Sequence, residues 1–307
     1  MIVYRELSTL SRDLGIPAKT LYAVSNAQDK HYRLIKIPKK DGTDRTLSIP
    51  DEILKKIQRA ISEQLLSREP ISRYATAYRP ASGILKNALP HVGKAKLLKL
   101  DILHFFDSIL YSAVKERAFP ADRYSESNRI LLSMLCYYRD TLPQGAPSSP
   151  AITNIIMRDF DEAVGAWCAE RKIAYTRYCD DMSFSGDFDE EEVIEYIAAR
   201  LKELGFTLNR RKTVVKTNSQ QQTVTGIVVN QKPNISAKYK REIRQAVFYC
   251  TKFGVTEHQK QIGSSQSPVA YLQALLGKIN YVLQVCPNDT SFAAYRKSVL
   301  ALLEKNR

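Results

Sequence analysis

The chain has 307 residues, 44% of them apolar and 25% charged, a balance that excludes a disordered chain and predicts a globular protein of two or three subdomains. No apolar run is long enough to cross a bilayer, and Arg5 and Glu6 lie where a secretory signal would need apolar residues. We therefore expect a soluble, cytoplasmic protein without membrane contacts.

The positive charge is concentrated near the C-terminus. The formal net charge is +14, and residues 231–307 contain twelve Lys or Arg against four Asp or Glu. Such a field attracts polyanions. The basic residues alternate with aromatic ones such as Tyr239 and Phe248 and do not border a long apolar face, so nucleic acid is favoured over an anionic membrane.

The first half of the chain predicts a helical extension and then a basic hairpin. Residues 1–30 have leucines at near-helical intervals. Residues 31–38 and 45–50 read as two strands joined by the turn 39–42. Asp51 should cap a helix that continues to Leu66, with Ile53 among its inward residues.

Residues 96–100 read as a buried strand that ends in Asp101. Further predictions are helices at 111–118, 128–138, 154–170 and 191–204, strands at 206–208 and 224–229, and a helical region after Pro233. The acidic run 187–195 is interpreted as a solvated first helical turn. Helices and strands without regular alternation indicate an α+β fold.

Tyr178-Cys179-Asp180-Asp181 places two adjacent acids at the turn of a predicted β-hairpin. Nucleotidyl transfer uses two divalent ions about 4 Å apart, held by carboxylates from neighbouring strands. Asp101 is the candidate third carboxylate, and hard oxygen ligands favour Mg²⁺. The alternatives are a solvated acidic turn and a strand-end acid that starts a turn. Cys179 is interpreted as a packing residue, and the scattered cysteines as reduced thiols.

Several motifs occur in the order found in reverse transcriptases, and over residues 32–260 the chain resembles the bacterial retron reverse transcriptases. The matching segments are Lys39-Lys40-Asp41-Gly42 with Arg45, Leu100 to Phe106, Leu142 to Pro150, Tyr178 to Asp181, and Gly205 to Asn209 with Arg211-Lys212-Thr213. Asn87-Ala88-Leu89-Pro90-His91 and Val224-Thr225-Gly226 are similar to two short retron elements. His91 could instead be a hydrogen-bonded surface histidine, and Val224 to Gly226 an ordinary strand ending.

The resemblance implies a right-hand polymerase with fingers, an antiparallel palm sheet with packed helices, and a small helical thumb. The predicted division is an N-terminal extension at 1–30, fingers and the start of the palm at 31–95, a palm at 96–232 with a fingers insertion around 110–150, and a basic thumb at 233–307.

The motif chemistry predicts roles for individual residues. Metal ligands would be Asp101, Asp180, Asp181 and the Ile102 carbonyl. Lys39 or Lys40 and Arg45 would clamp a deoxynucleoside triphosphate, although a solvated basic turn is the alternative. Gln144 and Gly145 would lie close to that nucleotide. The resemblance implies that Phe106 excludes a 2′-hydroxyl.

Lys212 could protonate the departing pyrophosphate or offset its charge, or it could be one of several phosphate contacts. The predicted RNA contacts are Asn87, His91, Val224, Thr225, Gly226, Lys238, Lys240, Arg241 and Arg244. Two residues depart from the retron pattern: Cys179 replaces the usual alanine, and Asp107 replaces a common proline.

The retron resemblance implies a cognate structured noncoding RNA as template and primer, initiation from an internal guanosine 2′-hydroxyl, and a branched RNA–DNA product (msDNA). It also implies anti-phage defence alongside a separate effector protein. Alternatives are another small bacterial reverse transcriptase, of the group II intron or diversity-generating kind, or a noncatalytic RNA-binding scaffold. The oligomeric state is not indicated.

Overall fold

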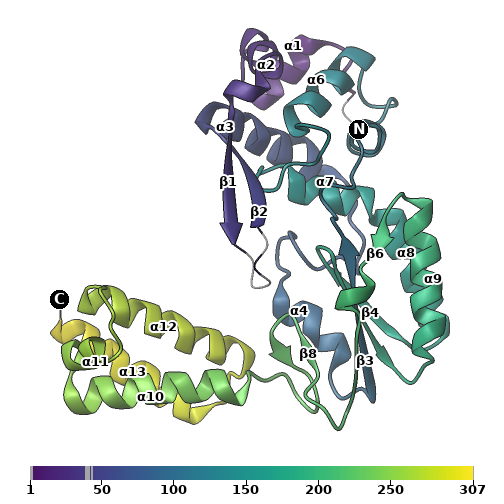
Figure 1. The fold of residues 1–307 in the computed structure, drawn as a ribbon. Helices are drawn as coiled ribbons and strands as arrows, with labels where there is room; N and C mark the ends of the chain where they lie inside the picture. Colours follow the sequence, from purple (N-terminus) through teal and green to yellow (C-terminus); the bar gives the residue numbers. More distant parts are fainter. Residues whose placement is uncertain (1–2, 39–41, 43, 307) are drawn as a thin grey trace. The chain divides into compact units, whose positions relative to one another are not determined.

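The computed structural model describes residues 3–38, 42 and 44–306, which form two compact units (Figure 1). Unit 1 comprises residues up to Gly83 together with Leu98–Val215, and unit 2 comprises Ile84–Leu97 with Lys216 onward. The four-part division expected from the sequence remains a prediction.

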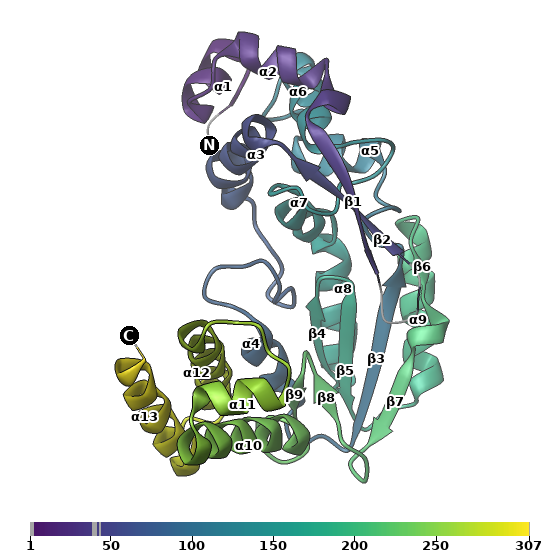
Figure 2. The same cartoon turned by 60° about the vertical axis from the view of Figure 1, so that its left-hand side comes forward.

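Unit 1 contains an antiparallel sheet with helices packed around it. The strand order is β4-β5-β3-β6, and β7 also pairs with β3. The strands are β3 (Lys96–Leu103), β4 (Ala174–Tyr178), β5 (Asp181–Gly186), β6 (Thr207–Leu208) and β7 (Val214–Thr217). Helices α8 (Arg158–Glu170) and α9 (Glu190–Glu203) lie side by side against this sheet (Figures 1 and 2). The α+β class is therefore confirmed.

The rest of unit 1 is helical, apart from the hairpin of β1 (Tyr32–Pro38) and β2 (Asp44–Pro50). Its helices are α1 (Leu7–Leu14), α2 (Ala18–Ser25), α3 (Glu52–Ala60), α5 (Tyr111–Ala113), α6 (Glu126–Cys136) and α7 (Ser149–Ile156). A π-helical turn at Ile61–Leu65 and a 3₁₀ turn at Leu66–Arg68 follow α3, and a π-helical turn at Val114–Ala118 follows α5. Asp51 caps α3 as predicted, since its carboxylate accepts from Leu54 N at 2.9 Å. Ile53 was expected to face inward but is 52% exposed, so that expectation is wrong.

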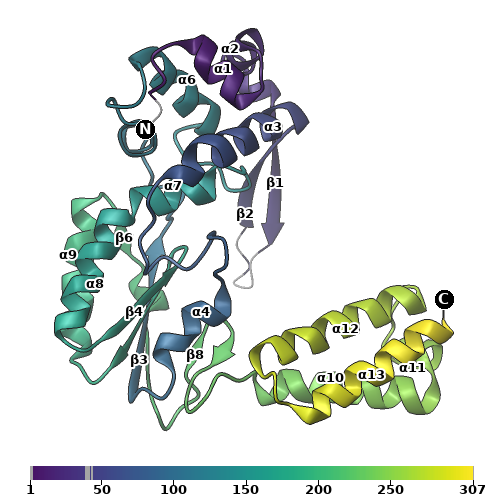
Figure 3. The ribbon, with the colours of Figure 1, turned by 180° about the vertical axis from the view of Figure 1, so that it is seen from behind.

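Unit 2 combines a short helix, a small hairpin and a helical bundle (Figure 3). The elements are α4 (Ile84–Ala88), β8 (Thr223–Val224), β9 (Ile227–Val228), α10 (Ala237–Phe253), α11 (Val255–Gln261), α12 (Pro268–Val285) and α13 (Thr290–Lys305). Buried side chains of the hairpin and bundle, including Val224, Ile243 and Ile279, form one hydrophobic core with Ala88. The helical region predicted after Pro233 is confirmed, and its first helix begins at Ala237.

Within the part of the chain that the structure describes, no helix combines the length and apolarity that crossing a membrane requires. All five cysteines are free thiols, as predicted.

Candidate active site

The Tyr178–Asp181 motif forms the tip of the β4–β5 hairpin. Tyr178 pairs with Asp181 in the strand register, so Cys179 and Asp180 are the turn and Asp181 is the first residue of β5. Cys179 has a left-handed backbone with φ of 60°. Such a conformation is uncommon for a residue with a side chain and must be held by its surroundings. The predicted hairpin is confirmed, with one acid in the turn and the other beginning a strand.

Asp101 lies inside β3 and not at the end of a strand. The predicted strand stopped at Leu100, but β3 continues to Leu103 because β6 pairs with its last residues, Ile102 opposite Leu208. Ile102 N donates to Asp180 O at 3.2 Å, which ties the acidic turn to β3 beside Asp101. Carboxylates from two strands therefore converge, as the two-metal hypothesis requires.

Asp101 is 5% exposed, and both of its carboxylate oxygens have partners. Asn209 donates through its side-chain amide to Oδ1 at 2.9 Å, and Lys212 Nζ donates to Oδ2 at 2.8 Å. Asn209 also donates its backbone N–H to Asp101 O at 2.8 Å. The 3₁₀ turn Arg210–Lys212, which follows β6, therefore brings Lys212 to the carboxylate.

A cavity of about 240 Å³ lies over this cluster and is lined by Asp101, Asp181 and Lys212, with Lys99, Leu100 and Val214. Burial raises the pKa of Asp181, and the nearby Asp180 carboxylate raises it further. The hydrogen bond to Asp101 raises the pKa of Lys212, so its ammonium form is favoured. The cavity thus brings two carboxylates together with two lysines, and the proximity of the acids to one another is what raises the pKa of Asp181 beyond the effect of burial.

The donor chemistry fits a divalent ion, because carboxylate oxygens are the ligands that hard cations prefer. The ammonium of Lys212 already occupies a cation's place against Asp101 Oδ2. Across the described ranges, however, no three His, Cys, Asp or Glu side chains are arranged closely enough to form a metal-binding group. Asp101, Asp180, Asp181 and the Ile102 carbonyl therefore remain candidate ligands.

Some of the residues predicted to bind nucleotide lie on segments that contact one another. Leu142 N donates to Phe106 O at 3.2 Å, and Ser48 N donates to Gln144 O at 2.9 Å, so the loop that begins at Leu142 contacts both the segment after β3 and strand β2. Gly145 has φ of 113°, and a Cβ there would lie 3.2 Å from Ser48 O, which explains the glycine. Arg45 is exposed on β2 opposite Ile37. Lys39 and Lys40 lie outside the described residues.

The two retron elements lie together in unit 2 and are largely buried. Asn87 Nδ2 donates to Thr225 Oγ1 at 3.3 Å, and Thr225 Oγ1 donates to Ile84 O at 3.1 Å. Thr225 and Gly226 both have positive φ between β8 and β9, the conformation of a type I′ hairpin turn. The element is therefore a turn and not a simple strand ending.

Burial changes how the predicted RNA contacts are interpreted. Asn87 is 1% exposed, whereas His91 and Val224 are fully buried. Burial lowers the pKa of His91 to about 4, so its neutral form is favoured. His91 is therefore no surface histidine, and these three side chains are placed to support the hairpin rather than to touch RNA directly.

The basic residues of α10 separate into two groups. Lys240 Nζ is 3.0 Å from Asp289 Oδ2, and Asp289 also caps α13 by accepting from Phe292 N. Lys238, Arg241 and Arg244 are exposed. Lys240 therefore ties α10 to α13, and the other three are available to a polyanion.

The predicted RNA contacts on α10 ended at Arg244, but the exposed side of the helix that carries Arg241 and Arg244 continues toward its C-terminal end. Arg241, Arg244, Phe248 and Lys252 recur at near-helical spacing on one side of α10, and we call them the α10 stripe. Lys252 Nζ lies 5.3 Å from the centre of the Phe248 ring, which is 52% exposed. Helical spacing from Arg241 was the signal that could have revealed it.

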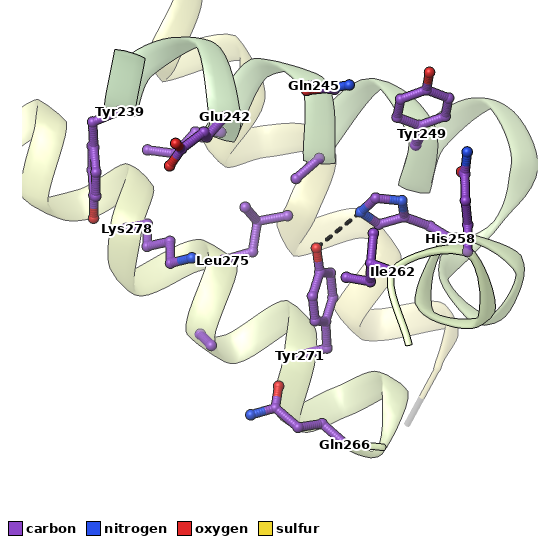
Figure 4. Close-up of a pocket in the computed structure, with 14 residues that line it drawn as sticks. Tyr239, Glu242, Gln245, Tyr249, His258, Ile262, Gln266, Tyr271, Leu275 and Lys278 are labelled. Carbon is purple, nitrogen blue, oxygen red and sulfur yellow. Dashed lines mark hydrogen bonds between the residues drawn. The ribbon is translucent and has the colours of Figure 1, made fainter. Parts of the chain in front are cut away.

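A second feature of unit 2 is a cavity of about 670 Å³ between α10, α11 and α12 (Figure 4). His258 Nε2 lies 3.0 Å from the Tyr271 hydroxyl, and its ring stacks on Tyr249. Glutamine side chains at 245, 261 and 266 also line this cavity. Its walls thus offer aromatic faces together with amide donors and acceptors.

Comparison with known proteins was made for the whole chain. Residues 37–244 match the family model described as "Reverse transcriptase (RNA-dependent DNA polymerase)". The retron Ec83 reverse transcriptase of Escherichia coli is 34% identical over 71% of this chain and 75% of its own length. The retron Mx65 reverse transcriptase of Myxococcus xanthus is 30% identical over 96% of this chain and 72% of its own length.

Among solved structures, apo telomerase from Candida tropicalis has a TM-score of 0.51 at 12% identity, over 90% of this chain and 58% of the telomerase chain. That likeness concerns the fold alone. Reverse transcriptases use divalent metal ions and deoxynucleoside triphosphates to copy RNA into DNA. The protein belongs to the reverse transcriptase family of right-hand polymerases, and within that family to the retron reverse transcriptases.

Proposed function

We propose that this RNA-directed DNA polymerase copies a cognate structured noncoding RNA from an internal guanosine 2′-hydroxyl, with the cavity over Asp101 as its active site. The observation that carries the site assignment is the convergence of β3 and the β4–β5 turn, joined by the bond from Ile102 N to Asp180 O. The retron relatives support the retron type of the enzyme. The branched msDNA product and a role in anti-phage defence with a separate effector protein are proposed from the resemblance to retron reverse transcriptases.

In this proposal Asp101, Asp180 and Asp181, with the Ile102 carbonyl, hold two Mg²⁺ ions. Bound divalent ions supply activation of the attacking hydroxyl and neutralisation of triphosphate charge. Asn209 orients the Asp101 carboxylate through its bond to Oδ1. Lys212 faces the same cavity as an ammonium, so it can neutralise or protonate the departing pyrophosphate.

The substrate groups are assigned from their positions. Gln144 and Gly145 order the incoming nucleotide beside β2, and Phe106 packs against its sugar. Phe106 is half-buried and lies edge-on to Phe105 with ring centres 5.6 Å apart, so its position is fixed by packing. Arg45, with Lys39 or Lys40, contacts the triphosphate.

RNA is held by the α10 stripe together with Lys238. Arginine and lysine pair with phosphates, and an exposed aromatic ring such as Phe248 can stack on a base. A second hollow of about 490 Å³, lined in part by Arg241 and Arg244, adjoins the same helix. Lys240 acts indirectly by joining α10 to the start of α13, and Asn87, His91 and Val224 act indirectly by supporting the β8–β9 hairpin.

The first test is extension of the copurified RNA with labelled deoxynucleotides and Mg²⁺. Asp180→Asn should lower the rate at least about 1,000-fold, because it removes a charge from the proposed metal site. The matched control is Asp187→Asn, an exposed acid beyond β5, which should leave the rate unchanged.

A debranching enzyme should then release the DNA from the RNA. DNA that is not joined to RNA, or an RNA–DNA product that the debranching enzyme does not cleave, would refute 2′ priming. Either result would favour another class of small bacterial reverse transcriptase. Full extension by Asp180→Asn would refute the site assignment itself.

A further inference from the structure

A fully buried ion pair lies directly beneath the acidic turn. Arg177 on β4 and Asp161 on α8 have side chains with 0% exposure, and Arg177 Nη2 lies 2.6 Å from Asp161 Oδ2. Arg177 Nε donates to Asp161 Oδ1 at 2.8 Å, which makes the contact bidentate. The Tyr175 hydroxyl donates to the same oxygen at 2.8 Å.

The remaining guanidinium nitrogen of Arg177 reaches the turn. Nη1 donates to Cys179 O at 2.9 Å, the carbonyl of the residue with the left-handed backbone. Nη2 also donates to Asn154 Oδ1 at 3.3 Å, and Asn154 Nδ2 donates to Ala77 O at 2.9 Å. One planar group thus joins α8, α7 and the acidic turn.

The backbone of Arg177 is fixed as well. Arg177 N donates to Tyr74 O at 2.8 Å, and Thr76 N donates to Arg177 O at 2.9 Å. Tyr74 in turn packs on Gly165 of α8, where a Cβ would meet its ring at 1.9 Å. The side chain that reaches Cys179 therefore extends from a backbone held on both sides.

A contribution to folding stability does not by itself explain why a charged pair such as Arg177 and Asp161 is buried. Removing two charges from water is costly, and well-packed apolar residues of similar size are often as stable. Hydrogen bonds to a charged group are nevertheless short and directional, so they fix geometry. The bond to Cys179 O fixes the turn from within unit 1's core, and the bond from Ile102 N to Asp180 O fixes it from β3.

We propose that Arg177 and Asp161 are positioning residues, which hold the Cys179 carbonyl and so set where the carboxylates of Asp180 and Asp181 stand relative to Asp101. This inference rests on the catalytic role proposed for those acids. It adds to the active site a buried support that touches neither nucleotide nor RNA.

The test replaces the buried ion pair and the tyrosine that donates to it by apolar residues, with the triple variant Arg177→Met, Asp161→Leu and Tyr175→Phe. All three polar partners leave together, so no buried charge is left unpaired and the variant is designed to fold. We expect kcat for primer extension to fall about 100-fold, since a displacement of about 1 Å at a reacting centre has that effect. The KM for nucleotide should stay within about twofold, because nucleotide contacts are unchanged.

Cys179 provides a readout that does not depend on activity. It is 7% exposed, whereas Cys168 on α8 is 1% exposed. Loosening of the turn should accelerate alkylation of Cys179, measured by mass spectrometry of peptides, while Cys168 remains protected as an internal control. General unfolding would instead accelerate both.

Two further variants keep the test decisive. Arg177→Lys retains the charge facing Asp161 but lacks the fork that also reaches Cys179 O, so it should shift alkylation and kcat in the same direction. Arg123→Met with Glu69→Leu removes another ion pair of unit 1, and it should alter neither value. Unchanged Cys179 alkylation in a folded triple variant, or faster alkylation with unchanged kcat, would overturn the proposal.

Discussion

The Cys179–Asp180 turn of unit 1 and the Thr225–Gly226 turn of unit 2 are both two-residue hairpin connections that contain positive φ, yet the motifs around them place their side chains in opposite ways. At the acidic turn Asp181 lines a cavity together with Asp101, and the charges of Arg177 and Asp161 are buried. In unit 2 the motif side chains are mostly buried, and the exposed charges lie on α10. A short motif can therefore mark chemistry in one place and scaffolding in another.

The strongest test of this contrast uses His91, whose role should be structural. Its pKa is lowered to about 4 from 6.5 by burial, so the unfolded chain binds a proton in this interval and the folded chain does not. The stability from neutral His91 is therefore present above pH 6.5 and is lost as pH falls toward 4, by about 3 kcal/mol. Urea unfolding followed by far-UV circular dichroism measures it.

His91→Gln should flatten this pH dependence, whereas His104→Gln, at an exposed position, should preserve it. Equal pH dependence in wild type and His91→Gln would show that His91 does not couple protonation to folding.

The second test concerns Phe106, whose role should be chemical. Phe106→Ala should raise incorporation of ribonucleotides relative to deoxynucleotides by roughly 30-fold, because the ring no longer opposes a 2′-hydroxyl. Single-nucleotide extension with each sugar gives the ratio. Phe105→Leu, at a buried neighbour, is the control; unchanged selectivity in Phe106→Ala would remove Phe106 as the sugar gate.

The third and smallest expected effect is at the α10 stripe. Arg241→Glu with Arg244→Glu should weaken RNA binding about tenfold and lower the salt slope by roughly two, since each lost phosphate contact removes about one unit. Arg296→Glu with Lys297→Glu on α13 is the charge-matched control. Equal losses from the two pairs, measured by RNA titration at several salt concentrations, would mean that net charge and not the stripe determines binding.

The sequence revealed local patterns better than their surroundings. Alternation and turn chemistry predicted the acidic hairpin, and Asp51 was recognisable as a cap. The end of β3 was missed because its last residues are paired by β6, a partner more than one hundred positions away. Ile53 was misassigned because an apolar side chain early in a helix can still face solvent.

The site could be predicted only where a motif names it. Asp101 and Asp180 were proposed from the predicted strand and turn and Lys212 from the motif that it matches, and the structure places Asp101 beside Lys212 and the acidic turn. Asp161 and Arg177 have no local pattern, because their pairing depends on the contact between α8 and β4. In the sequence Lys240 cannot be distinguished from its basic neighbours, but in the structure its ammonium forms an ion pair with Asp289. The sequence alone does not show which charged residues form ion pairs within the protein and which remain free to bind a ligand.

The bond from Ser48 N to Gln144 O has a mechanical consequence. It joins the β1–β2 hairpin, which carries Arg45, to the loop that carries Gln144 and Gly145, and the tight approach of Gly145 to Ser48 O leaves little room for sliding. If the proposed nucleotide contacts hold, a displacement of the hairpin by the triphosphate would therefore also displace the loop beside the sugar and base. We expect the hairpin and the loop to respond together to one bound nucleotide.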